Sequence, residues 1–230
     1  MLKHSVLLLV ILLSSQTFGA VSEIESKVLQ VSGHGKVSLP ASIAQISVAI
    51  SILDKNAAKV QGELRTKTNR LTKALKGDKV EKLSTDQYQI QTRSRYQGGK
   101  KQDLGFEGLA ILSFEVPVDR AGEMLDRVIK HGANEIRHIR FTATEQELSH
   151  ARNKALAMGA QKALKEGQQI LGSLGLDYQE IAQVIVGPQG GGPRDMSRLQ
   201  FARSSADESV AIEAGDVDVG AQVMLILKYK

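Results

Sequence analysis

The final segment of the chain constrains its fold more than any other feature. Every second residue from Val217 to Tyr229 is apolar, without interruption. A period of two places every apolar side chain on one face of an extended strand, whereas a helix would scatter them around its axis. The chain must therefore contain a half-buried sheet, and the same alternation at residues 43–53 predicts a second strand of this kind.

Hydrophobic periodicity predicts ten elements along the chain. Strands are expected at 28–36, 43–53, 83–96, 106–118, 135–142, 180–186 and 216–229, and helices at 57–76, 120–130 and 145–171. Asp54 or Asn56 is expected to cap the first helix and Asp119 the second, and Thr144 and Glu147 form a T-x-x-E capping box before the third. A turn is expected at 38–42 and a hairpin loop at 98–103.

Each predicted helix has an apolar face that must pack on a sheet. The first is expected to bury Val60, Leu64, Leu71 and Leu75, and the second Met124, Leu125, Val128 and Ile129. The third has a mixed stripe of small and large residues, at steps of four and three: Leu156, Ala160, Ala163, Gly167, Ile170 and Leu174. The order ββαββαβαββ interleaves hairpins with helices, which predicts an α+β fold with mixed or antiparallel sheets and packed helices.

The first nineteen residues predict export. Lys3 makes the start basic, residues 6–13 are an unbroken apolar run, and a polar stretch ending in small residues follows. This is the organisation of a secretory signal peptide, and the run is far shorter than the ~20 residues of a bilayer-spanning helix. Cleavage is expected after Gly19, with Ala20 as the alternative. We therefore expect a periplasmic protein with a signal peptide at 1–19, a domain at 27–230 and no transmembrane span after cleavage.

Composition and missing motifs exclude several classes of function. The chain has no cysteine, which excludes disulfides, thiol redox chemistry and thiolate metal sites. It has no tryptophan and only four tyrosines and five phenylalanines, so it lacks the stacking aromatics expected of a protein that binds single-stranded nucleic acid. It contains no G-K-[ST], H-E-x-x-H or G-x-S-x-G motif. We expect no catalytic residue, no cofactor and no metal.

Four stretches together cover nearly the whole predicted mature chain. They are VSGHGKVSLP at 31–40, LSTDQYQI at 83–90, a helix at 151–172 that begins ARNKAL, and IEAGDVDV at 212–219. In this order they resemble the SIMPL-domain family of exported bacterial proteins, which includes periplasmic immunogenic proteins and oxidative-stress-defence proteins of the envelope. Ala41 departs from the family pattern, which has an acidic residue after the proline. The resemblance implies an α+β fold, no established enzymatic reaction and, in some members, large hollow homo-oligomers.

Glycine and histidine residues are two further kinds of candidate binding site. Gly33-His34-Gly35 could be a fragment of a phosphate-binding loop, but a third glycine and a following helix are missing. A bend or bulge in the first strand is the favoured interpretation. The predicted mature chain has histidines at His34, His131, His138 and His150, and no two have ligand spacing on one element, so no metal site is expected.

Two groups of cations could contact an anionic partner. In the first helix, Arg65, Lys67, Arg70, Lys73 and Lys76 are interpreted first as a solvated face. The Gly-, Ser- and Arg-rich segment at about 187–205 is predicted to be a mobile insertion. Its Arg194, Arg198 and Arg203 are the better candidates for binding an anionic envelope component, although a plain flexible insertion is the first interpretation.

These patterns and the family resemblance together predict a non-enzymatic periplasmic SIMPL-type protein that self-associates; the resemblance implies that it supports envelope integrity and oxidative-stress tolerance. The final strand is expected at a sheet edge, where unpaired backbone groups could pair with a second copy. The alternative is a periplasmic binding module for a small apolar or anionic ligand, with the 187–205 segment as a lid. A hydrolase is the least favoured hypothesis, because no nucleophile–base pair is visible.

Overall fold

The computed structural model describes residues 27–187 and 213–230. Their order is ββαββαβαββ, which confirms the predicted order and the α+β class. The strands are β1 (Val28–Pro40), β2 (Ile43–Asp54), β3 (Glu81–Gln97), β4 (Lys100–Pro117), β5 (Glu135–Thr142), β6 (Tyr178–Val186) and β7 (Asp216–Tyr229). The helices are α1 (Ala57–Gly77), α2 (Ala121–Lys130) and α3 (Glu145–Ser173), and a 3-10 helix, Val118–Arg120, leads into α2.

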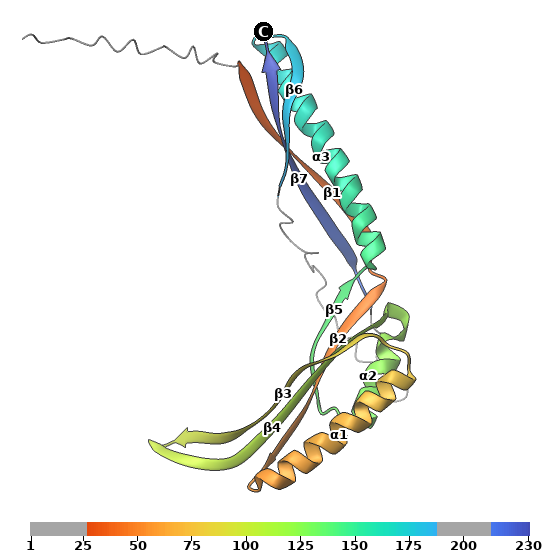
Figure 1. The fold of residues 1–230 in the computed structure, drawn as a ribbon, viewed down its shortest axis with the longest axis vertical. Helices are drawn as coiled ribbons and strands as arrows, with labels where there is room; N and C mark the ends of the chain where they lie inside the picture. Colours follow the sequence, from red (N-terminus) through yellow and green to blue (C-terminus); the bar gives the residue numbers. More distant parts are fainter. Residues whose placement is uncertain (1–26, 188–212) are drawn as a thin grey trace, which may run out of the picture.

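The strands form two separate antiparallel sheets (Figure 1). The three-stranded unit consists of strands in the order β1-β7-β6 with α3 packed along them. The four-stranded unit consists of strands in the order β3-β4-β2-β5 with α1 and α2 on one face. The two units lie end to end in an elongated molecule. The four-stranded unit, residues 43–142, is inserted in the sequence between β1 and α3.

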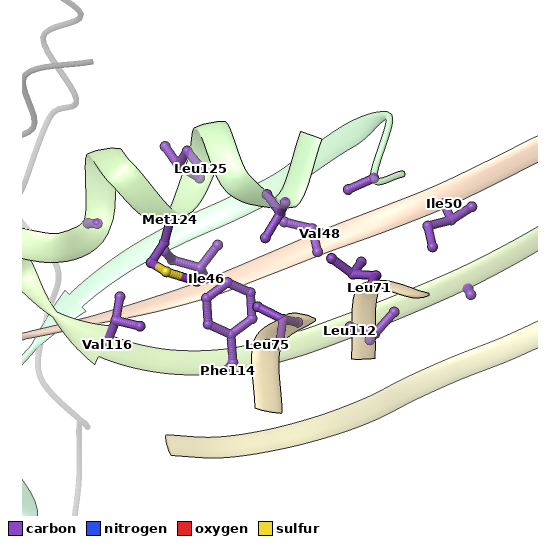
Figure 2. Close-up of a cluster of buried hydrophobic side chains, with 14 of the residues drawn as sticks. Ile46, Val48, Ile50, Leu71, Leu75, Leu112, Phe114, Val116, Met124 and Leu125 are labelled. Atoms are coloured by element: carbon purple, nitrogen blue, oxygen red, sulfur yellow. The ribbon is translucent and has the colours of Figure 1, made fainter. Parts of the chain in front are cut away.

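The four-stranded unit has a core of large apolar side chains (Figure 2). β2 and β4 pair so that Ile46 lies opposite Phe114 and Val48 opposite Leu112. These side chains pack beneath α1 and α2, and the stripe predicted for the first helix is buried there. Fully burying a side chain of this size contributes about 1.5–3 kcal/mol. This unit is therefore stabilised mainly by side-chain burial.

The three-stranded unit depends on a close approach between the backbones of β1 and α3. A Cβ atom on Gly33 would lie 2.0 Å from the carbonyl oxygen of Gly159, and one on Gly35 would lie 1.8 Å from that of Ala155. Only glycine fits at such contacts. β1 pairs with β7 along its whole length without a register shift, so the expected bend or bulge at these glycines was wrong. The glycines instead make room for the helix.

Sequence signals identified the start of two of the three helices. Asn56 Oδ1 accepts hydrogen bonds from N–H groups in the first turn of α1 at 2.9 and 3.2 Å, so Asn56 rather than Asp54 is the cap. Thr144 and Glu147 form the predicted capping box of α3. α2 follows the 3-10 turn and has no side-chain cap, so the prediction that Asp119 caps it was wrong.

Two connections are shorter than expected. β1 continues to Pro40, so the turn predicted at 38–42 is confined to residues 41–42. β3 and β4 are joined by Gly98 and Gly99, at φ +59° and +76°, and the rest of the predicted 98–103 loop belongs to β4. A two-residue hairpin turn with positive φ at both positions suits paired glycines.

Two predicted helix faces also need correction. Ile129 on α2 is 48% exposed rather than buried. The buried row of α3 runs in steps of four, through Ala151, Ala155, Gly159, Ala163, Gly167 and Leu171. Of the predicted stripe only Ala163 and Gly167 belong to it, because β1 approaches the helix too closely for large side chains. Leu156 and Ile170 are only partly buried, and Leu174, just beyond the helix, is 66% exposed.

Candidate functional site

Edge strand β6 carries a group of uncovered apolar side chains. β6 pairs with β7 on one side, and no described strand pairs with its other side. Among the described residues, four of the twelve large apolar side chains that are exposed lie on this strand: Ile181, Val184, Ile185 and Val186. Clusters of this kind on a surface commonly mark interaction sites.

The exposure follows from the position of α3. Ile181 and Val184 pair with Leu227 and Leu225, whose side chains are buried beneath α3. Paired residues of an antiparallel ladder point to the same face, so the side chains of Ile181 and Val184 also point to the side of the sheet on which α3 lies. α3 packs on β1 and β7 and barely reaches β6, which leaves Ile181 39% and Val184 55% exposed.

The opposite face of β6 is mixed, because Glu180 and Gln183 lie on it beside Ile185. Ile185 pairs with Met224 on the face away from α3 and is exposed. Residues 181–186, IAQVIV, are apolar except for Gln183. A nearly continuous apolar run is typical of a strand that is covered on both faces. The side chains of β6 therefore suit a covered strand, although β6 lies at an edge.

The final strand lies elsewhere than predicted. β7 is the central strand of its sheet, with β1 on one side and β6 on the other. Its backbone groups are engaged along both edges, so the prediction that this strand offers a free edge was wrong. Alternation identified β7 as a half-buried strand but carried no information about its neighbours. The apolar run at 181–186 does not reveal the free edge either, because such a run predicts a covered strand.

A shallow polar pocket of about 230 Å³ lies on the face of the four-stranded sheet. Lys82, Glu115, Gln45, Ser113 and His138 help to line it. Lys82 has a positive φ of +48°, at a point where the pairing of β3 and β4 shifts register. Its Nζ atom lies 3.3 Å from a Glu115 carboxylate oxygen, and Gln45 donates a hydrogen bond of 2.8 Å to the other oxygen.

Lys82 also joins the two units. Its Nζ atom lies 2.8 Å from the Glu145 carboxylate at the start of α3. The hydrogen bonds to Glu145 and Glu115 raise the pKa of Lys82 above its ordinary value. The amine therefore stays protonated at neutral pH, which suits an ion pair and opposes a nucleophilic role.

A second carboxylate adjoins this pocket. Asp86 accepts hydrogen bonds from the hydroxyl groups of Ser113 and Ser84, and these bonds lower its pKa. The Ser113 hydroxyl thus donates its hydrogen bond to a carboxylate rather than to an imidazole base. This geometry differs from that of an activated serine nucleophile.

The four histidines of the predicted mature chain lie in separate parts of the fold. His34 is on β1, His131 follows α2, His138 is on β5 and His150 is on α3. In the described ranges, no three histidine, aspartate or glutamate side chains are grouped as a metal site.

The predicted cation groups have different outcomes. Arg194, Arg198 and Arg203, and most of the 187–205 segment, lie outside the described residues, so their anionic partner remains a prediction. The predicted signal peptide at 1–19 is likewise outside them. On α1, Arg65, Arg70, Lys73 and Lys76 are exposed and Lys67 is half-buried.

Comparisons with known proteins identify the family of the chain. The family model SIMPL, described as a protein of unknown function (DUF541), matches residues 29–226, from the start of β1 almost to the end of β7. A search of curated proteins found no match. No helix among the described residues is long and apolar enough to cross a membrane. Because the family model spans both units, the chain belongs to the SIMPL family, as the sequence motifs predicted.

Proposed function

We propose that this SIMPL protein is a non-enzymatic, exported component of the periplasm that self-associates through β6 and supports envelope integrity and oxidative-stress tolerance. The single observation that carries the proposal is the edge strand β6, which exposes four large apolar side chains and is unpaired on one side in the described structure. A strand of this kind can add a strand from another chain.

A second copy suits this edge for two reasons. Two β6 strands can pair antiparallel about a two-fold axis, so that each contributes the same surface to the other. The only charged residue on β6 is Glu180, and its carboxylate lies 2.8 Å from Lys228 Nζ of the same chain, so little repulsion opposes the pairing. The two three-stranded sheets would then form one continuous sheet that brings the exposed Ile181 and Val184 side chains of both copies together.

Other observations support the remaining parts of the proposal. The three-part pattern at 1–19 supports export, and the motifs shared with exported stress-defence proteins support a role in the envelope. The protonated Lys82 and the carboxylate-bound Ser113 support a non-enzymatic role, because neither is arranged as a nucleophile.

The proposal is tested first by the native mass of the purified protein. The full chain has a mass of 24.9 kDa, and we expect light scattering after size exclusion to give a multiple of the chain mass. Val184→Lys places a charge on the exposed edge without disturbing a buried side chain. We expect this variant to dissociate.

Leu53→Lys is the matched control, because Leu53 is 53% exposed, close to the value for Val184, and lies in the other unit. We expect its mass to equal that of the wild type. A wild-type mass of one chain would refute self-association, and a multimer that persists in Val184→Lys would refute the β6 interface.

Export and the stress role are tested in cells. We expect the protein in the periplasmic fraction, and we expect a deletion strain to survive peroxide less well than its parent. Recovery in the cytoplasm, or unchanged survival, would contradict the corresponding part of the proposal.

A further inference from the structure

The positive charge of the chain is concentrated in one helix. α1 contains six basic residues and one acidic residue, Glu63, a net charge of +5. The whole chain also has a formal net charge of +5, so the rest of the sequence is neutral overall. Such an asymmetry makes one surface of the molecule attractive to anions.

Most of these cations have no carboxylate partner among the described residues. Lys59 forms an ion pair with Asp54 at 2.6 Å, whereas the other five form none. Arg70 donates a hydrogen bond to the backbone oxygen of Lys130 at 3.2 Å, which fixes it toward α2. Arg65, Lys73 and Lys76 are exposed and lie within about 80° of arc, at 100° per residue, on the side opposite the buried stripe.

We infer that this outer face of α1 docks on the surface of an anionic lipid bilayer. α1 lies on the outside of the four-stranded sheet (Figure 1), and this face points away from the stripe that packs on the sheet, so it presents charges to a broad surface rather than enclosing a small ligand. α1 contains no aromatic residue that could stack on a base or a sugar. A bilayer of acidic phospholipids supplies the complementary charge over a broad area.

The association is electrostatic. The apolar side of α1 is buried against its own sheet, so it is not free to insert among lipid chains. Cations near an acidic membrane each contribute about fivefold to the partition constant, and the effect is screened within about 10 Å at 0.1 M salt. Binding should therefore be sensitive to salt. The inference does not depend on self-association, because β6 lies in the other unit.

The test is co-sedimentation of the full chain with vesicles of phosphatidylcholine, with and without phosphatidylglycerol. Binding to phosphatidylcholine alone measures any contribution from the apolar run at 6–13. We expect the wild type to bind the acidic vesicles and to be released by about 1 M salt. The triple variant Arg65→Gln/Lys73→Gln/Lys76→Gln should bind about 100-fold more weakly.

α3 offers a closely matched control. Lys154, Lys162 and Lys165 are exposed and also lie within about 80° of arc on their helix. Replacing all three by Gln lowers the net charge by the same amount, and we expect binding within about twofold of the wild type. Equal losses in both triple variants, wild-type binding by the α1 triple variant, or equal binding to neutral vesicles would overturn the inference. Circular dichroism confirms that both variants are folded.

Discussion

In the four-stranded unit, large side chains hold α1 and α2 on their sheet. In the three-stranded unit, by contrast, α3 approaches β1 closely at positions where β1 has glycine and therefore no side chain. Phe114 and its neighbours fill the space between layers, while Gly33 and Gly35 remove that space. The two interfaces should therefore respond to opposite kinds of mutation. The first loses stability when atoms are removed, and the second when atoms are added.

The largest effect is expected from Gly33→Ala. The new Cβ would lie 2.0 Å from the backbone oxygen of Gly159 and 2.6 Å from the backbone nitrogen of Ala163, and backbone atoms cannot move aside as a side chain would. We expect unfolding free energy to fall by about 4 kcal/mol or more, measured by urea unfolding followed by circular dichroism.

Gly62→Ala is the control for this substitution. Gly62 lies inside α1, and a Cβ there would meet nothing within 4 Å. The same change should stabilise the protein by about 0.5–1 kcal/mol, because alanine favours helix more than glycine does. A similar loss in both variants would contradict the close-approach argument.

Phe114→Ala should have the next largest effect. Phe114 is almost fully buried between β4 and the helices (Figure 2). Removing its ring leaves a cavity, and we expect a loss of about 3 kcal/mol in the same urea assay. Tyr96→Ala, which removes an aromatic ring that is 73% exposed, should change stability by less than about 0.5 kcal/mol. If Phe114→Ala and Tyr96→Ala lowered the unfolding free energy by similar amounts, burial of the Phe114 ring would not be the source of its stabilising effect.

This contrast explains how far the sequence predicts the fold. Alternation and capping signals depend on neighbours in the chain, so they identified β2, β5, β7 and the Thr144 box almost to the residue. The division into two sheets, the central place of β7 and the free edge of β6 depend on partners distant in sequence. The role of Gly33 was missed for the same reason, because glycine spacing within one strand does not reveal a helix more than a hundred residues away.

The smallest effect concerns the joint between the units. Glu147 accepts a hydrogen bond of 2.6 Å from Ser42 Oγ and one of 2.8 Å from the backbone N–H of Thr144, and these bonds lower its pKa below 4.5. A lowered pKa stabilises the fold at pH above the unfolded value, and this contribution is lost as pH falls through the folded value. Glu147→Gln should therefore be less stable than the wild type at pH 7, and the difference should shrink below pH 4.5.

The measurement is a series of melting temperatures from pH 7 to about pH 3. Ser42→Ala removes the largest cause of the shift, so adding Glu147→Gln to that variant should have a smaller, less pH-dependent effect. A difference between Glu147→Gln and the wild type that stays constant across the series would show that the carboxylate does not contribute through its charge.

The ladder between β1 and β7 also bears on how the chain reaches its native state. It joins residues 28–40 to residues 216–228, so the first strand to be synthesised waits for the last one. Residues 43–142 are contiguous and can form their layers earlier, whereas the three-stranded unit has a high contact order and needs both ends of the chain. Until β7 arrives, β1 remains an open strand that a chaperone or a neighbouring chain can reach.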